Sequence, residues 1–300
     1  MTEAVLLAAH GTVDDLNDLG AFVTNVRRGH RPAPELIEEL RRRYEAIGGS
    51  ALNAINAEVA RKLQSLLQVP VVWANRLWRP YVRDVLASLA RTGVRRAALI
   101  PLAQHSAHVY EADARSAAKE AGIELACAVN WGQHPGLHHA FASRIVQALA
   151  TLPEGGATVV MTAHSLPRTV IDAGDPYERE VNAAAGAIAQ AVRERTGRGA
   201  NFALSFQSQG LAGAGGSIDW LGPDLRSTLD LVKARGDRHV VFAPIGFLAD
   251  HVEILYDLDI EARAMAAARA LSFARAASLN ADDDLIEVLA EVARPLLSHE

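Results

Sequence analysis

The sequence has few of the features that secreted, membrane-spanning and cluster-binding proteins need. Its 300 residues include one cysteine, Cys127, so neither an internal disulfide bond nor a cysteine-ligated iron–sulfur cluster can form within this chain alone. No apolar run approaches the roughly 20 residues of a membrane-spanning helix, and the N-terminus lacks the basic start of a signal peptide. We therefore expect no integral membrane segment, a mature N-terminus near Met1 and a cytoplasmic location.

The chain also lacks an excess of basic charge and a phosphate-binding loop. Its formal net charge of -5 gives no general attraction to nucleic acid or to anionic lipid, so nucleic acid is not an expected partner. Neither a Walker loop nor a Gly-x-Gly-x-x-Gly motif follows the first apolar run. A generic nucleotide-binding protein is therefore the least favoured alternative.

Short apolar runs alternate with helical patterns along the chain. Runs without strict polar alternation are typical of strands buried on both faces, and helices between them predict a parallel sheet. Residues 32–48 and 175–197 have the clearest helical patterns, with Asp175 placed as an N-cap. The predicted strands are residues 4–9, 69–75, 97–103, 124–129, 157–163, 201–206 and 239–245. These patterns predict an α/β fold.

Two of the apolar runs resemble each other. The segment "VLLAAHG" (5–11) and the segment "VVMTAHS" (159–165) both end in alanine, histidine and a small residue. Either an internal duplication or chance similarity between aliphatic runs explains the match. A duplication predicts two similar halves.

Histidines and an aspartate follow directly on the predicted strands. They are His10, His105, His164 and the pair Asp250-His251. A lone histidine beside an apolar run is more often a core residue than a reactive one. In open parallel sheets, however, ligands bind outside the carboxyl ends of the strands. Because these residues collect at that edge, we expect them to form part of a functional site.

A row of acidic residues is the second chemical feature. Glu253, Asp257 and Glu261 are spaced four apart, which on a helix places three carboxylates on one face, about 6 Å between neighbours. A solvated acidic face is the alternative interpretation. Apolar residues crowd the same segment, which favours carboxylates that face a cleft and conduct protons or cations. Carboxylate and imidazole ligands together suit a metal such as Fe²⁺ better than Mg²⁺.

Two loops have a composition that suits a charged, flat ligand. The segment "NVRRGHRPAP" (25–34) carries Arg27 and Arg28, which can bind carboxylates or phosphates, although a solvated turn explains it equally well. Residues 205–210 and 219–224 are polar and glycine-rich around Trp220, where backbone and an aromatic ring can approach a flat molecule.

In six segments the chain resembles the ferrochelatase family, whose members insert Fe²⁺ into a porphyrin at the end of heme synthesis. The segments occur in family order and span nearly the whole chain, and the last two are highly specific. They are "RRYEAIGG" (42–49), "TAHSLP" (162–167), "GDPY" (174–177), "FQSQG" (206–210), "WLGPD" (220–224) and "PIGFLADHVEILYDLDIE" (244–261). The segment "RRGHRP" (27–32) is most similar to the soluble bacterial subgroup that acts on coproporphyrin.

The resemblance implies a chelatase-like fold of two Rossmann-like parallel-sheet halves, with the C-terminal helix packing on the first half. We expect halves at residues 1–140 and 141–270 and the returning helix within 271–300. Fe²⁺ and a porphyrin, either coproporphyrin III or protoporphyrin IX, are the implied substrates, and heme is the implied product. No iron–sulfur cluster is expected, and other heme-pathway enzymes are expected as transient partners.

The resemblance also implies roles for single residues. His164 is the catalytic histidine, Glu253 is its acidic partner, and Asp257 and Glu261 continue the acidic row for metal or protons. The implied substrate contacts are Arg27 and Arg28 on the propionate loop, Arg43 at a position linked to a peripheral metal site, Ser50 and Trp220.

The chain departs from the family pattern at three places. His10 replaces the tyrosine usual at the end of the first strand, and we expect it to contact both the porphyrin and the iron. Phe206 replaces the family's tryptophan, and residues 211–219 are rich in glycine and alanine. Two further alternatives remain, a chelatase of the same fold that loads Co²⁺ or Ni²⁺ and a non-catalytic heme or metal carrier.

Overall fold

The structure, a computed structural model, describes residues 2–196, 200–208 and 218–298. Most of the glycine- and alanine-rich loop, residues 211–217, therefore lies outside the described residues, as does Gly197, the expected end of the second helix. The chain divides into two compact units. Unit 1 comprises residues 1–42, 49–136 and 280–300, and unit 2 comprises residues 43–48 and 137–279.

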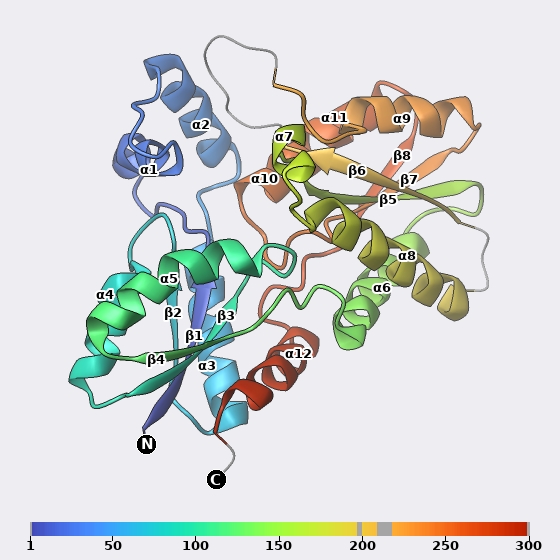
Figure 1. Ribbon diagram of the computed structural model, residues 1–300. Coiled ribbons are helices and arrows are strands. Elements are labelled where there is room, and N and C mark those ends of the chain that lie inside the picture. Colours follow the sequence, from blue (N-terminus) through green and yellow to red (C-terminus); the bar gives the residue numbers. More distant parts are fainter. Residues whose placement is uncertain (1, 197–199, 209–217, 299–300) are drawn as a thin grey trace. The chain divides into compact units, whose positions relative to one another are not determined.

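The sheet of unit 1 has four parallel strands in the order β2-β1-β3-β4 (Figure 1). Its strands are β1 (Glu3–Ala9), β2 (Val71–Asn75), β3 (Arg96–Pro101) and β4 (Glu124–Cys127). Its helices are η1 (Leu16–Asp18), α1 (Leu19–Val26), α2 (Pro34–Ala46), α3 (Leu52–Leu67), α4 (Val82–Arg91), α5 (Ala107–Ala121), α12 (Asp283–Ala293) and η3 (Arg294–Leu296). The last turn of α2, from residue 43, belongs to unit 2.

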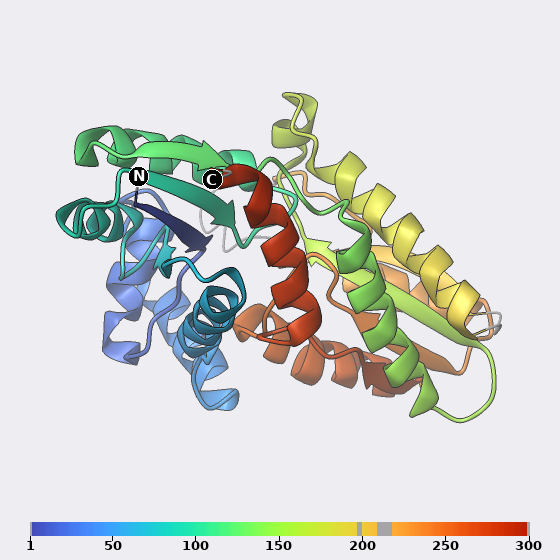
Figure 2. The same cartoon turned by 90° about the horizontal axis from the view of Figure 1, so that it is seen from below.

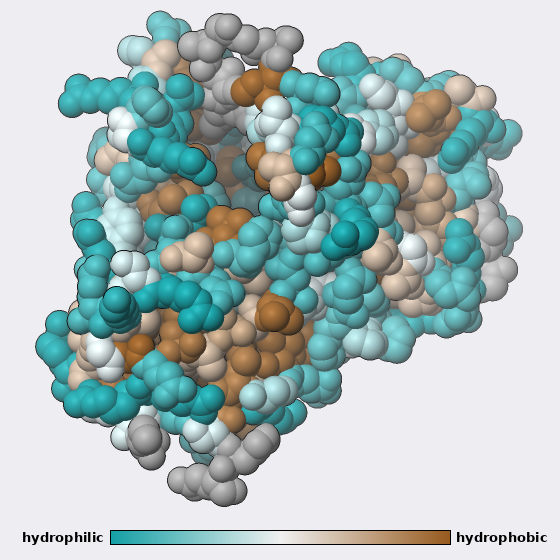
Figure 3. Space-filling model, in the orientation of Figure 1, coloured by the Kyte–Doolittle hydropathy of each residue, from teal (hydrophilic) through white to brown (hydrophobic). Residues whose placement is uncertain are grey.

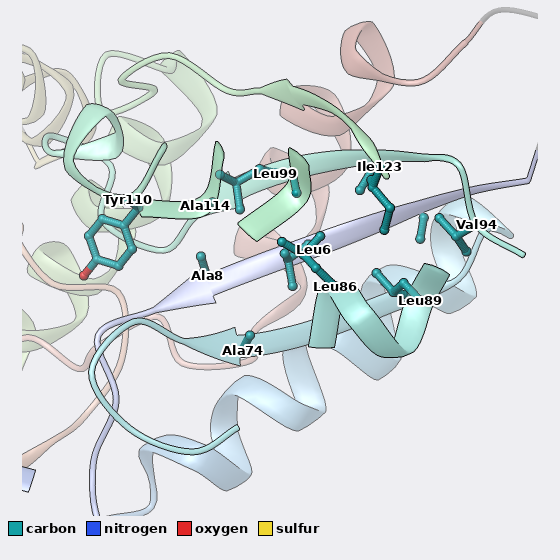
Figure 4. Close-up of a cluster of buried hydrophobic side chains, with 13 residues drawn as sticks. Leu6, Ala8, Ala74, Leu86, Leu89, Val94, Leu99, Tyr110, Ala114 and Ile123 are labelled. Atoms are coloured by element: carbon teal, nitrogen blue, oxygen red, sulfur yellow. The ribbon is translucent and has the colours of Figure 1, made fainter. Parts of the chain in front are cut away.

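The central strand β1 is buried on both faces, as its aliphatic sequence predicts. Leu6 and Leu99 point to one face, where they pack with Leu86 of α4 and Ala114 of α5 (Figure 4). Val5 and Leu7 alternate with Leu6 along the strand and are also fully buried. Both faces of this sheet are therefore covered, which is the usual state of a parallel sheet.

The C-terminal helix α12 completes unit 1. It packs against α3 and β3, and Figure 2 shows α12 in red beside the blue α3. Lys62 of α3 lies 2.7 Å from Asp283, and the backbone N–H of Ser298 donates to Glu3 at the start of β1 over 2.9 Å. The expectation that a C-terminal helix packs on the first half is therefore confirmed.

The sheet of unit 2 repeats the arrangement, with four parallel strands in the order β6-β5-β7-β8. Its strands are β5 (Ala157–His164), β6 (Asn201–Gln207), β7 (His239–Ala243) and β8 (Ser272–Arg275). Its helices are α6 (Pro135–Ala150), which begins in unit 1, α7 (Arg168–Asp172), α8 (Tyr177–Thr196), α9 (Leu225–Ala234), α10 (Val252–Leu255), the π-helix η2 (Asp257–Ala262) and α11 (Arg263–Ala267).

The predicted α/β class is confirmed, and each of the seven predicted strands is present. The two predicted helices are present as α2 and α8, and the side chain of Asp175 accepts a hydrogen bond from the backbone N–H of Tyr177 at the start of α8. The strand β8 was not predicted from the sequence. It is four residues long and ends in an arginine, so its apolar content is too small to identify it.

Because β8 pairs with β7, residues 271–279 remain in unit 2, and the returning segment begins at residue 280. Phe273 of β8 stacks on the buried Phe242 of β7 with 5.6 Å between ring centroids. The strand is thereby fixed to the sheet by both backbone and side-chain contacts.

The visible surface is mainly hydrophilic, with hydrophobic residues over the β4 edge of unit 1 (Figure 3). That edge strand is only partly buried, and Val129 just beyond it is 81% exposed. Within the described parts of the chain, every helix is too short or too polar to cross a membrane.

Candidate active site

His164 is the last residue of β5, at the carboxyl edge of the sheet of unit 2. The strand before it is buried, and His164 lies opposite Gln207, the last residue of β6. Its side chain is 37% exposed, in contrast to the buried Ala163 and Ser165 on either side. The fold therefore delivers this imidazole from a rigid strand to the edge at which parallel sheets bind ligands.

The imidazole of His164 has a defined tautomer. Its Nδ1 lies 2.5 Å from the carbonyl oxygen of Ser165, and since a carbonyl only accepts hydrogen bonds, Nδ1 carries the hydrogen. In the neutral imidazole, Nε2 then carries the lone pair. The hydroxyl of Tyr177 donates to the carbonyl of His164 over 2.9 Å, and burial raises the pKa of this phenol, which keeps it protonated as a donor.

Glu253 lies between two histidines. Its Oε1 is 3.8 Å from Nε2 of His164, and its Oε2 is 3.6 Å from Nε2 of His251. The side-chain amide of Gln207 donates to the backbone carbonyl of Glu253 over 2.8 Å, which ties the start of α10 to the end of β6. The predicted pairing of His164 with Glu253 is therefore present in the geometry of unit 2.

His251 faces Glu253 in the same way as His164 does. Its Nδ1 lies 3.0 Å from the carbonyl of Ala249, so Nδ1 donates and Nε2 points to the carboxylate. Burial lowers the pKa of His251, but the hydrogen bond with Glu253 and the charge of that carboxylate outweigh burial, and the net pKa is raised. A cation beside Glu253 is thereby stabilised.

The acidic row is not a single α-helix, as the spacing had suggested. Glu253 lies on the one-turn helix α10, whereas Asp257 and Glu261 lie on the π-helix η2. The backbone N–H of Glu261 donates to the carbonyl of Tyr256, five residues back, over 3.0 Å. This wider turn changes the helical period, which a four-residue spacing alone does not reveal.

Asp257 is the most buried of the three carboxylates. One oxygen accepts from Arg43 over 3.1 Å, and the other accepts from the hydroxyl of Ser208 over 2.8 Å. Burial raises the pKa of Asp257 to about 6, helped by the charge of Glu253, while Ser208 and Arg43 act in the opposite direction. This carboxyl therefore exchanges its proton near neutral pH.

Arg43 bridges two of the acids. Its Nη2 is 3.8 Å from Glu261, its Nη1 bonds to Asp257, and its guanidinium lies over the Tyr256 ring at 4.7 Å from the centroid. Among the residues that the structure describes, no three His, Cys, Asp or Glu side chains are grouped closely enough to enclose a metal ion. The row therefore consists of Glu253, which lies beside two histidines, and of Asp257 and Glu261, which both contact Arg43.

Trp220 lies beside the chain that follows His164. It forms an antiparallel bridge with Pro167, and the backbone N–H of Arg168 donates to the carbonyl of Asp219 over 2.7 Å. Trp220 is only partly buried, so its ring remains available for contact.

His10 follows β1 in unit 1 in the same way that His164 ends β5. It is exposed, its Nδ1 lies 3.3 Å from the carbonyl of Gly11, and Phe22 meets its ring edge-on at 6.3 Å between centroids. Gly11 has a φ of +108°, and an added Cβ would lie 3.1 Å from atoms of Asn75 and Trp78. The turn that presents His10 therefore requires glycine.

The remaining predicted residues of unit 1 lie on two loops. Arg27 caps the end of α1, and Arg28 follows it, exposed, with a φ of +54°. The hydroxyl of Ser50 accepts from the backbone N–H of Leu52 over 3.4 Å at the start of α3. These residues and His10 belong to unit 1, whereas the other predicted site residues belong to unit 2.

Three residues that shape this site have no role predicted from the sequence, namely Tyr177, Gln207 and Ser208. His251 was expected at the sheet edge, but its pairing with Glu253 was not predicted. Gln207 and Ser208 follow a predicted strand directly, which is the same signal that identified His164. Tyr177 has no such signal, because only the packing of α8 brings its hydroxyl to β5.

Two four-stranded parallel sheets, each with a histidine at its carboxyl edge, define a chelatase-like α/β protein. A solved structure described as SirB from Bacillus subtilis with Fe³⁺ shares this fold, with a TM-score of 0.59 and 14% identity over 99% of this chain and 96% of that one. The family model for Ferrochelatase matches residues 2–296. The chain belongs to the ferrochelatase family.

Relatives support this assignment along nearly the full length. A ferrochelatase from Thermus thermophilus is 36% identical, covering 96% of this chain and 97% of that protein. A coproporphyrin III ferrochelatase from Mycobacterium ulcerans is 34% identical, covering 93% of this chain and 83% of that protein. The resemblance noted in the sequence is thereby confirmed.

Proposed function

We propose that this chain is a lyase that inserts Fe²⁺ into a porphyrin to form heme, with His164 as the group that accepts pyrrole protons. The observation that carries the assignment of His164 is its hydrogen bonding. Nδ1 is held by the carbonyl of Ser165, so the Nε2 lone pair is presented at the sheet edge beside Glu253. Membership of the ferrochelatase family supplies the reaction.

The reaction requires two protons to leave the porphyrin as Fe²⁺ enters. Pyrrole nitrogens must also move out of the ring plane, so the enzyme is expected to bind the distorted macrocycle best. His164 takes up a proton at Nε2, and Glu253 at 3.8 Å stabilises the resulting imidazolium. Asp257 and Glu261 then pass protons outward or Fe²⁺ inward, and a carboxyl with a pKa of about 6 suits this exchange.

The substrate that we propose is coproporphyrin III. Its four propionates match the basic loop at residues 27–31, which carries Arg27, Arg28 and Arg31 around His30. Relatives that carry the name coproporphyrin III ferrochelatase support the same choice. Ser50, Trp220 and Arg43 complete the proposed substrate contacts, with Arg43 also at the edge of the acidic row.

We assign His10 to the iron of the product. Its Nδ1 lies 3.3 Å from the carbonyl of Gly11, and the side chain is exposed just beyond the carboxyl end of β1. Because the identity of the axial ligand tunes heme iron, we expect a contact from His10 to change the affinity for the product and the rate of its release.

We place the reaction in the cytoplasm. One cysteine in 300 residues fits a reducing compartment, and a reactive iron porphyrin product favours direct transfer through transient contact with other heme-pathway enzymes.

The test is anaerobic insertion of Fe²⁺, followed optically, with coproporphyrin III and protoporphyrin IX side by side. His164→Ala is expected to fold and bind porphyrin but to insert iron at least about 10²-fold more slowly, the usual effect of losing a general base. His139→Ala, at an exposed position on α6, is the matched control and should keep the wild-type rate. Near wild-type turnover in His164→Ala would remove His164 from the chemistry.

The same assay tests the alternatives. Faster insertion of Co²⁺ or Ni²⁺ into another tetrapyrrole would indicate a different chelatase. Tight heme binding without any turnover would indicate a carrier.

A further inference from the structure

Arg275, the last residue of β8, is bonded to two carboxylates on either side of Glu253 and Asp257. We propose that Arg275 is a positioning residue that holds the acidic row in place for the insertion reaction, an inference that rests on the proposed function. The guanidinium does not touch Glu253 or Asp257. It acts through Asp250 and Asp259 instead.

The contacts form a fork. Nε of Arg275 donates to Oδ1 of Asp259 over 2.8 Å, and Nη1 donates to Oδ1 of Asp250 over 3.2 Å. The hydroxyl of Ser278 also donates to Oδ1 of Asp250, over 2.7 Å. Two N–H groups of one planar group therefore bind two separate carboxylates, a geometry that a lysine ammonium reproduces poorly.

The anchor of this fork is rigid. Arg275 pairs with Phe242 of β7 in the sheet, and Phe242 is fully buried. The Arg275 side chain is itself only 14% exposed, and its Nη1 reaches the carbonyl of Ala276 over 3.4 Å. A charge-assisted bond from a fixed support of this kind is stronger than one between two mobile surface chains.

The two carboxylates bracket the functional segment. Asp250 directly precedes His251, the N-cap residue of α10, and Asp259 lies in the π-helix η2. The residues between them carry Glu253 and Asp257. Arg275 therefore ties this segment to the sheet through both Asp250 and Asp259, and its removal takes away one of the contacts that fix the π-helix, which is a rare conformation.

Electrostatic repulsion between Asp250 and Asp259 adds to the effect of losing the hydrogen bonds of Arg275. Because Asp250 and Asp259 bind one guanidinium, they lie close together, and without Arg275 they would repel each other. The nearby Arg263 lies 4.0 Å from Asp259 and over the ring of Phe273 of β8, but its side chain is 56% exposed, against 14% for Arg275. We therefore expect its charge to replace Arg275 poorly.

The experiment measures insertion with Fe²⁺ and porphyrin varied separately. Arg275→Gln is expected to lower kcat about tenfold and to raise KM for Fe²⁺ at least about threefold, the scale seen when groups that orient metal ligands are lost. KM for porphyrin should stay within about twofold, since the proposed porphyrin contacts lie elsewhere. Arg275→Lys should recover only part of the loss. Full recovery would contradict the claim that a planar guanidinium is needed to bind both carboxylates.

Arg269→Gln is the matched control. Arg269 makes a similar ion pair, 2.7 Å from Asp230, and is 16% exposed, but its partner lies on α9 and not in the acidic segment. It should keep wild-type kinetics. If Arg275→Gln folds poorly, Asp259→Asn removes only the charge of the Asp259 contact and should shift KM for Fe²⁺ in the same direction.

A second readout separates this inference from the proposed function. Amide hydrogen exchange across residues 250–262 should be faster in Arg275→Gln than in wild type, and unchanged in Arg269→Gln. Unchanged exchange would overturn the positioning role whether or not the protein inserts iron. Absence of iron insertion by the wild type would refute the proposed function and leave the exchange result to decide on the positioning of the segment.

Discussion

The raised pKa of Asp257 leads to a specific prediction about stability, because burial in the fold disfavours the ionised form of this carboxyl. Its pKa is raised from 3.8 to about 6, chiefly by burial and then by the charge of Glu253. A group whose pKa is raised on folding stabilises the folded state below its unfolded pKa, and this stability is lost as pH rises through the folded value. The ionised Asp257 therefore lowers the free energy of unfolding at neutral pH.

The size of this cost follows from the shift. About two units, at about 1.36 kcal/mol per unit, amount to about 3 kcal/mol once the pH exceeds the folded pKa. Asp257→Asn replaces the carboxyl with a neutral group of similar shape that still accepts from Arg43. The variant is expected to be more stable than wild type at pH 8, and its advantage should grow by about 2 kcal/mol between pH 4 and pH 8.

Urea unfolding of both proteins at several pH values measures this difference. Asp230→Asn is a control with the opposite pH dependence. The hydrogen bond from Arg269 lowers the pKa of the exposed Asp230 carboxyl, so the stability that this carboxyl contributes is lost as pH falls. Parallel stability curves for wild type and Asp257→Asn across this pH range would refute the reasoning.

Two further predictions concern the sheet edges of the two units. His10→Ala is expected to change the absorption spectrum of bound heme and to weaken heme binding about tenfold, because an axial ligand is removed; an unchanged spectrum would reject the contact. Gly246→Ala is expected to cost about 1 to 3 kcal/mol of stability, because the new Cβ would lie 2.6 Å from Cβ of Ala163 beside His164; a thermal unfolding midpoint equal to wild type would contradict this.

The strands were predictable because parallel sheets bury both faces and leave continuous aliphatic runs in the sequence. Residues 4–9 and 157–163 have this pattern, and they became the central strands β1 and β5. Strand β8 has too few apolar residues for the same signal. It forms because its backbone pairs with the edge of β7 and because Phe273 stacks on Phe242.

The site was predictable only in part. Spacing identified Glu253, Asp257 and Glu261, but the π-helix that changes their relative direction depends on backbone hydrogen bonds that spacing does not encode. Arg43 meets Asp257 across 214 residues of sequence, so only the fold brings them together. The tautomer of His164 likewise depends on a carbonyl whose direction is set by the turn after β5.

The way the chain threads through unit 1 has a consequence for its synthesis. Helix α12, which buries Leu285 and Leu289 against that unit, is synthesised after all of β5 to β8. Unit 2 is nearly continuous in sequence, and its last residue, Leu279, is also synthesised before α12 begins. The first half to be translated therefore lacks its last helix until synthesis of the chain is nearly finished.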